Sequence, residues 1–169
     1  LLPLPDLLPV DRFDESVSPE GGLILGLVDV PSKQTQRPLL WNVMHDSHLL
    51  FFGGSRSGRT TAVRTLLAQA VQRFTPADLH VYAVDYGTGS LLPFVDAPHI
   101  GAVVTPQDAG RLPRLLDRLS GELSNRQAIL ARAGVGSIAE QRKQADPRDA
   151  LAYAVIVIDG WERLGASMS

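Results

Sequence analysis

The stretch FFGGSRSGRTTAVRTLL, residues 51–67, passes from an apolar strand-like segment into a helix-like segment, with glycines at the junction. Gly53, Gly58, Arg59 and Thr60 have the spacing of the phosphate-binding loop G-x-x-x-x-G-K-[ST], with arginine in the lysine position. Such a loop needs small residues, so that backbone N–H groups can surround a phosphate, and a helix N-terminus behind them. The stretch therefore predicts a strand, a phosphate-binding loop and a helix in immediate succession.

The candidate nucleotide-binding residues form one continuous segment. They are Gly53, Gly54, Ser55, Arg56, Ser57, Gly58, Arg59, Thr60 and Thr61. In this pattern the Thr60 hydroxyl is a ligand for Mg²⁺, and Arg59 keeps a positive charge for the outer phosphates. The forked guanidinium can pair with phosphate oxygens but cannot act as a compact ammonium. We expect ATP and Mg²⁺ to bind with poor alignment for hydrolysis; the alternative is a glycine turn that binds no ligand.

A second candidate element is AVIVIDG, residues 154–160, in which an apolar strand ends at Asp159. A carboxylate in this position is a candidate Mg²⁺ ligand that would act together with Thr60. The next residue, Gly160, cannot serve as a general base, so no catalytic residue is assigned. Asp85 ends another apolar strand. It either borders the same nucleotide pocket or caps the turn that follows it.

The order of the elements indicates an α/β fold with a mostly parallel sheet flanked by helices. Apolar runs typical of strands occupy residues 21–30, 39–43, 48–52, 78–85, 100–104 and 153–161. Helical periodicity occupies residues 60–74 and a long segment from Thr105-Pro106 to about residues 133–137. The first two strands predict an N-terminal β-hairpin. The strands at 48–52 and 154–158 are expected to lie side by side, because Gly53 and Asp159 must face one metal ion.

Composition narrows the function classes. The 169 residues are 44% hydrophobic, which suits a globular domain, and there is no cysteine for a disulfide or for thiol catalysis. The formal net charge of −2 gives no general attraction to nucleic acid. Residues 1–20 are proline-containing and predict an extended linker, followed by a domain over 21–169. We expect that domain to be C-terminally incomplete, with no helix after residue 160.

Four segments together resemble the FtsK/SpoIIIE-type ATPase modules of the membrane-bound EccC (EssC-like) motor of type VII secretion. They are GLVDVPSKQTQRPL (26–39), GGSRSGRTTAVRTLL (53–67), VYAVDYGTGSLLPFVDAPHIGAVV (81–104) and VIVIDGW (155–161). The turn D-x-G-x-G-x-L at 85–91 and the ending IDGW most resemble the second of the three tandem modules.

The resemblance implies a RecA-like P-loop NTPase fold and a nucleotide pocket formed by residues 53–61 with Asp159. It also implies a location at the cytoplasmic face of the cell membrane, reached through the rest of the full-length protein. The implied partners are adjacent ATPase modules and small helical-hairpin secreted proteins. The departures at Arg59 and Gly160 imply weak or absent hydrolysis. Restoring lysine and glutamate at these positions is expected to raise it.

Two other functions fit parts of the sequence. The first is an interaction module that binds a peptide or linker and uses no nucleotide. The second is a DNA translocase of the FtsK kind. Arg111, Arg114 and Arg118 form a basic stripe, but three acidic residues lie among them, which favours a solvated helix face: Asp108, Asp117 and Glu122. DNA is therefore not expected as a partner.

Overall fold

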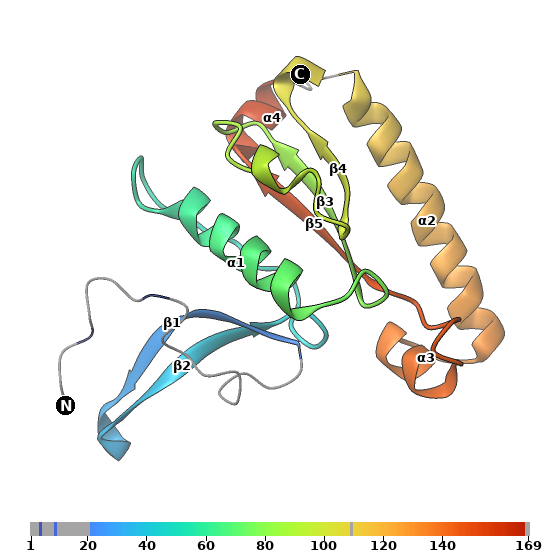
Figure 1. The fold of residues 1–169 in the computed structure, drawn as a ribbon, viewed down its shortest axis with the longest axis horizontal. Coiled ribbons are helices and arrows are strands. Elements are labelled where there is room, and N and C mark those ends of the chain that lie inside the picture. Colours follow the sequence, from blue (N-terminus) through green and yellow to red (C-terminus); the bar gives the residue numbers. More distant parts are fainter. Residues whose placement is uncertain (1–3, 5–8, 10–20, 109, 168–169) are drawn as a thin grey trace. The chain divides into compact units, whose positions relative to one another are not determined.

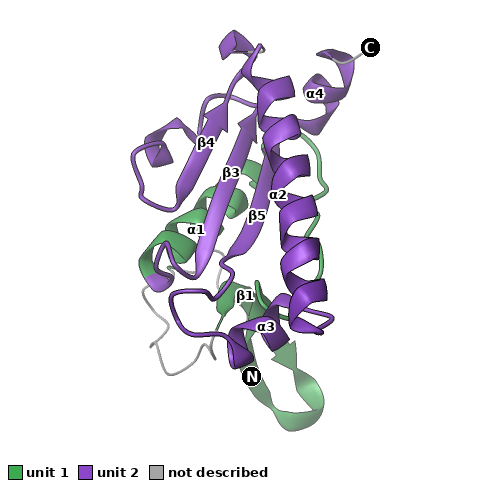
Figure 2. Cartoon of the chain, turned by 90° about the vertical axis from the view of Figure 1, so that its right-hand side faces the viewer, with its two compact units in different colours: residues 1–72 green, residues 73–169 purple. Residues whose placement is uncertain are grey.

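The computed structural model describes residues 4, 9, 21–108 and 110–167 (Figure 1). The chain divides into two compact units, residues 1–72 and 73–169 (Figure 2). Apart from Leu4 and Pro9, the expected linker over residues 1–20 lies outside the described residues.

The first unit contains the expected β-hairpin. Strand β1 (Gly22–Val30) pairs antiparallel with β2 (Thr35–Asn42). The connection is the short 3₁₀ helix η3 (Pro31–Lys33), followed by Gln34 in a left-handed conformation, φ 50°. The register of the hairpin shifts between Ile24 and Gly26, so one residue of β1 bulges out of the ladder.

Helix α1 (Arg59–Arg73) belongs to the first unit, except for its last residue, and is attached to β1 at this irregularity. The buried Gln69 side chain accepts a hydrogen bond from Ile24 N–H at 2.8 Å and donates one to Ile24 C=O at 2.9 Å. An amide side chain matches a peptide group in donors and acceptors, so Gln69 takes the place of a neighbouring strand for one residue. The helix is thereby fixed to the hairpin by a pair of polar contacts.

The predicted strand at residues 48–52 is wrong: this segment is irregular in the structure. The hairpin ends at Asn42, where the Asp46 carboxylate accepts the backbone N–H at 2.6 Å and a turn follows. A strand needs a neighbour that completes its hydrogen-bond ladder. Leu50 and Phe52 are 85% and 97% exposed. The expected pairing of this segment with residues 154–158 involves both units and stays a prediction.

The second unit contains a three-stranded parallel sheet, as the sequence predicts. Its strands are β3 (Leu79–Asp85), β4 (Ile100–Val104) and β5 (Tyr153–Asp159), in the order β4-β3-β5. The central strand β3 is buried along most of its length, which explains its continuous apolar sequence. Its pairing with β5 places Asp85 directly beside Asp159 at the carboxyl edge of the sheet.

The long helix α2 (Arg111–Ala133) lies along one face of this sheet (Figure 2). Pro113 falls in its first turn, where the missing N–H breaks no helical hydrogen bond. Gly134, with φ 67°, ends the helix. The core between helix and sheet consists of Tyr82, Val84, Tyr86, Val104, Leu112, Leu115 and Leu164.

Two short helices were not predicted. Ser137 accepts a hydrogen bond from Glu140 N–H at the start of α3 (Ile138–Gln144), the S-x-x-E signature of a helix N-terminus. Helix α4 (Trp161–Ser167) follows β5 directly, so the expectation of no helix after residue 160 is wrong. The remaining short 3₁₀ helices are η4 (Leu92–Phe94) and η5 (Pro106–Asp108).

Candidate functional site

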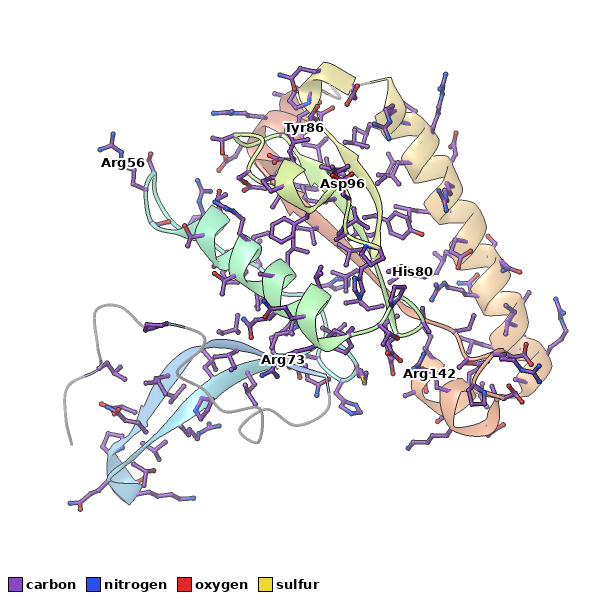
Figure 3. All side chains as sticks on the ribbon, in the orientation of Figure 1. Arg56, Arg73, His80, Tyr86, Asp96 and Arg142 are labelled. Atoms are coloured by element: carbon purple, nitrogen blue, oxygen red, sulfur yellow. The ribbon has the colours of Figure 1, made fainter. Side chains whose placement is uncertain are left out.

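The predicted phosphate-binding loop is a compact turn in the first unit. Ser57 N–H donates to Gly54 C=O at 3.3 Å, and a Cβ at Gly53 would lie 2.6 Å from Ser57 Oγ. Arg56 has a left-handed φ of 62°, and its side chain extends from the loop (Figure 3). Gly58, with φ 87°, leads into α1 in a conformation that glycine adopts without strain. The loop therefore depends on its glycines for closure and for entry into the helix.

The N-terminus of α1 gives this loop its electrostatic character. The first helical hydrogen bond runs from Ala62 N–H to Gly58 C=O at 2.9 Å. The N–H groups of the first turn carry the positive end of the helix dipole, and no acidic residue lies in that turn. Such an end favours phosphate.

The predicted residues of the loop differ in how far they are exposed to solvent. Arg59 and Thr60 are half-buried in the first turn of α1. The others, Gly54, Ser55, Arg56, Ser57, Gly58 and Thr61, are exposed, apart from the half-buried Gly53. The exposed part of the predicted site is therefore the loop itself, whereas the first two residues of α1 are half-buried.

Asp85 caps the turn that follows β3. Its buried carboxylate accepts hydrogen bonds from Gly87 N–H at 3.1 Å and Gly89 N–H at 3.3 Å through Oδ1, and from Leu91 N–H at 2.8 Å through Oδ2. Only 1% of the residue is exposed. Of the two roles considered for Asp85, turn capping is the one this geometry performs. A position at the border of a nucleotide pocket stays a prediction.

Asp159 lies against this capped turn. Its Oδ2 is 2.6 Å, and its Cγ 3.1 Å, from the position that a Cβ on Gly87 would occupy. The same position is 3.4 Å from Asp85 Oδ1. Tyr86 N–H donates to Asp159 C=O at 2.9 Å. The second unit therefore brings the two predicted carboxylates together around Gly87.

Gly160 is required by the backbone that surrounds it. Its φ is 80°, and a Cβ would lie 2.5 Å from Tyr86 C, 2.6 Å from Tyr86 O and 2.6 Å from Gly87 N. These are main-chain atoms, so no rotation of a side chain could relieve the overlap. The turn after β3 excludes any side chain from the residue that follows Asp159.

Sequence reasoning missed Arg163, which holds the same turn from the other side. Its Nη1 donates to Gly87 C=O at 2.8 Å and lies 3.5 Å from Tyr86 C=O. Because α4 was not predicted, no pattern in the sequence pointed to this contact. Tyr86 itself is buried at the end of β3 (Figure 3).

The donor chemistry fits a hard cation bound together with a nucleotide. Thr60 in the first unit and Asp159 in the second each offer only oxygen atoms, which Mg²⁺ prefers. Mg²⁺ is usually held by few protein ligands together with phosphates and water. A site that these two residues share stays a prediction. Among the described residues, no three or more His, Asp or Glu side chains cluster in a way that could hold a metal ion. None of the described helices has the length and apolar character needed to cross a membrane.

Comparison with known proteins shows which family the sequence matches. The profile of the FtsK/SpoIIIE family matches residues 24–165. The type VII secretion system protein EssC of Staphylococcus aureus strain Mu50 is 30% identical over 140 residues, which cover 83% of this chain and 9% of EssC. The chain thus spans a small part of that relative.

Solved structures of similar proteins share the fold. EssC (ATPases 2 and 3) of Geobacillus thermodenitrificans is 25% identical, with a TM-score of 0.88, and the match covers 100% of this chain and 32% of that one. EccC (ATPases 2 and 3) of Thermomonospora curvata, solved in complex with a signal sequence peptide, is 28% identical with a TM-score of 0.77. That match covers 87% of this chain and 27% of that one.

Proposed function

The chain belongs to the FtsK/SpoIIIE family, and from that membership we propose that it is an ATP-binding module of a type VII protein secretion motor with weak or absent hydrolysis. The observation that carries the proposal is a glycine-dependent loop at the start of α1, combined with a backbone that excludes any side chain after Asp159. The first feature suits phosphate binding, and the second removes the position of a general base.

The proposal assigns a role to each part of the loop. The backbone of residues 53–58 and the first turn of α1 bind the phosphates through N–H groups. Arg59 pairs with phosphate oxygens, while the Thr60 hydroxyl and the Asp159 carboxylate hold Mg²⁺. When bound, Mg²⁺ neutralises part of the phosphate charge. The proposal thus assigns each ground-state contact with the nucleotide and its Mg²⁺ to a group of this chain.

Hydrolysis needs a group that activates water, and the chain lacks one next to Asp159. A positioned general base contributes about 10²- to 10⁴-fold to a rate. Arg59 adds a second penalty, because small displacements of a positioned phosphate cost on the order of 10²-fold. The module would therefore use ATP occupancy, rather than fast turnover, to control its contacts.

The proposed partners follow from the relatives. The Geobacillus and Thermomonospora structures contain ATPases 2 and 3 together, so we propose adjacent ATPase modules as neighbours of this one. The signal sequence peptide bound by the Thermomonospora protein supports small helical-hairpin secreted proteins as substrates. The site of action would be the cytoplasmic face of the membrane, where the rest of the full-length protein is anchored. The ending IDGW supports assignment to the second module.

The test is a titration of the 169-residue chain with a fluorescent ATP analogue and Mg²⁺, with phosphate release followed in parallel. We expect saturable binding with little turnover, and loss of binding in Gly58→Val. Gly134→Val is the matched control, because both glycines have a positive φ, a Cβ at either one meets no atom within 4 Å, and Gly134 lies at the end of α2. No binding at millimolar nucleotide would favour a peptide-binding module without ATP. Rapid turnover would refute the assignment of a missing base.

A further inference from the structure

We infer that the turn between β3 and η4, fastened by Asp85 and Arg163, positions the Asp159 carboxylate, and that Gly87 is glycine so that this carboxylate can lie against the turn. The role of Asp159 as a Mg²⁺ ligand rests on the proposed function. The position of its side chain beside Gly87 is a feature of the structure and does not depend on that function. Gly87 and Arg163 are positioning residues, since they would act on the metal only through Asp159.

Hydrogen bonds from two side chains, Asp85 and Arg163, fix the conformation of the turn. On one side the buried Asp85 carboxylate binds the N–H groups of Gly87, Gly89 and Leu91. Oδ1 accepts the first two of these hydrogen bonds and Oδ2 accepts the third. On the other side the Arg163 guanidinium binds the Gly87 carbonyl at 2.8 Å. The peptide groups on both sides of Gly87 are therefore fixed.

The Asp159 main chain joins the same arrangement. Its C=O accepts the Tyr86 N–H at 2.9 Å, so β5 is tied to the beginning of the turn. The Asp159 carboxylate then lies beside Gly87, with Oδ2 only 2.6 Å from the position where any other residue would carry a Cβ. Ligating carboxylates are commonly oriented by groups behind them, and loss of such a group typically costs about 10- to 100-fold in metal affinity.

An alanine at position 87 isolates this effect from folding. Its Cβ would lie 2.6 Å from Asp159 Oδ2, the mobile end of a side chain. Gly87 is not among the glycines with positive φ, so its backbone imposes no strain on alanine. The carboxylate can therefore turn away at small cost in stability. The same substitution at Gly160 would meet main-chain atoms, which cannot turn away.

Arg163 extends the arrangement to α4. The helix begins at Trp161, two residues after Asp159, and its third residue, Arg163, donates a hydrogen bond to the Gly87 carbonyl of the turn. A shift of α4 would therefore move the surface against which Asp159 rests. Lysine at 163 could still donate to the Gly87 carbonyl, whereas alanine could not.

The experiment measures the Asp159 side chain directly and through Mg²⁺. The χ1 angle of Asp159 is read from NMR side-chain couplings in wild type, Gly87→Ala and the helix control Gly121→Ala. The affinity for a fluorescent ATP analogue is measured with Mg²⁺ and with EDTA. We expect Gly87→Ala to change χ1 and to lower affinity about 10-fold in Mg²⁺ only. Arg163→Ala should show a smaller loss that Arg163→Lys restores.

The outcomes separate this inference from the proposed function. An unchanged Asp159 χ1 in Gly87→Ala, or an equal loss of affinity with Mg²⁺ and with EDTA, would overturn the inference. A changed χ1 in a chain that binds no nucleotide would support the positioning of Asp159 while refuting the ATP-binding proposal. Equal melting temperatures of wild type and Gly87→Ala are expected, and a large loss would show that the turn only supports the fold.

Discussion

Gly160 shows how one residue without a side chain limits the chemistry beside it. From the sequence alone, Gly160 is the position where the resemblance leads us to expect a glutamate, and restoring that glutamate is the obvious substitution to test. In the structure its φ is 80°, and a Cβ would overlap the main chain of Tyr86 and Gly87. The turn after β3 occupies the space that a side chain at position 160 would need. A glutamate therefore cannot be introduced unless this turn moves.

The first prediction follows from that overlap. Gly160→Glu should lower the free energy of unfolding by more than about 1 kcal/mol, because it forces both a strained φ and a main-chain clash. Arg59→Lys should leave stability nearly unchanged. The prediction that Arg59→Lys and Gly160→Glu together raise hydrolysis requires the turn after β3 to move and admit the new side chain. Urea denaturation of the two single variants tests this, and wild-type stability in Gly160→Glu would show that the turn yields easily.

Among the elements, the contact between α1 and β1 depends on a side chain that replaces a peptide group. Gln69 satisfies both polar groups of Ile24 beside the bulge. The helix that follows the predicted phosphate-binding loop is thus fixed to the hairpin beside the point where the β ladder is interrupted. A polar residue on the buried face of a helix looks like an error in the pattern until its partner is known.

The second prediction tests that contact. Gln69→Leu should destabilise the chain by about 1–3 kcal/mol, because it leaves a buried N–H and C=O without a hydrogen bond. Gln72→Leu is the control, since Gln72 is exposed on the same helix. Thermal or urea unfolding measures both variants. An equal effect of the two substitutions would mean that the Gln69 hydrogen bonds contribute nothing beyond hydrophobicity.

In the second unit, α3 is joined to the start of β3 by an ion pair. Arg142 Nη2 lies 2.5 Å from Asp78 Oδ1, and Arg142 Nη1 donates to Leu151 C=O at 2.9 Å. Hydrogen bonds from the Thr75 hydroxyl and backbone, together with Arg142, hold the pKa of Asp78 below its ordinary value of 3.8, against the opposing effect of partial burial. The helix and the strand are therefore coupled through a carboxylate that must stay ionised.

The third prediction concerns pH. Because the pKa of Asp78 is lower in the folded chain, its contribution is present above pH 3.8 and is lost as the pH falls through the folded-state pKa. Asp78→Asn should reduce stability near neutral pH by about 0.5–1 kcal/mol, a value discounted for partial exposure. The difference in stability between Asp78→Asn and wild type should shrink as the pH falls below 3.8. A difference that stays constant between neutral and strongly acidic pH would contradict this assignment.

At the scale of the whole molecule, a ligand that binds the folded chain should stabilise it. The fourth prediction is that ATP with Mg²⁺ raises the melting temperature, since a ligand at 100 times its Kd adds about 2.7 kcal/mol. The rise should be smaller with EDTA and absent in Gly58→Val. Differential scanning fluorimetry measures it. Equal shifts in wild type and Gly58→Val would place the nucleotide elsewhere than the loop.

The sequence by itself determined the family, the hairpin, the parallel strands β3, β4 and β5, and the helix that follows the glycine loop. These features depend on local periodicity and on the spacing of Gly53, Gly58 and Thr60, and both are properties of short stretches of sequence that do not depend on tertiary contacts. The irregular segment at 48–52 was predicted wrongly for a related reason, because a strand pattern says nothing about whether a neighbouring strand is present. Helix α4 was missed because few residues follow β5.

Only the tertiary structure decided the surroundings of Asp159. Asp85, Gly87, Gly160 and Arg163 come from segments that are distant in sequence, and they meet because parallel pairing sets Asp85 beside Asp159. The need for glycine at 87 and 160 depends on atoms of another strand's turn, so no local pattern could express it. Sequence reasoning found the groups that could bind a nucleotide. The packing of one turn decided which atoms lie beside the Asp159 carboxylate and why residue 160 has no room for a side chain.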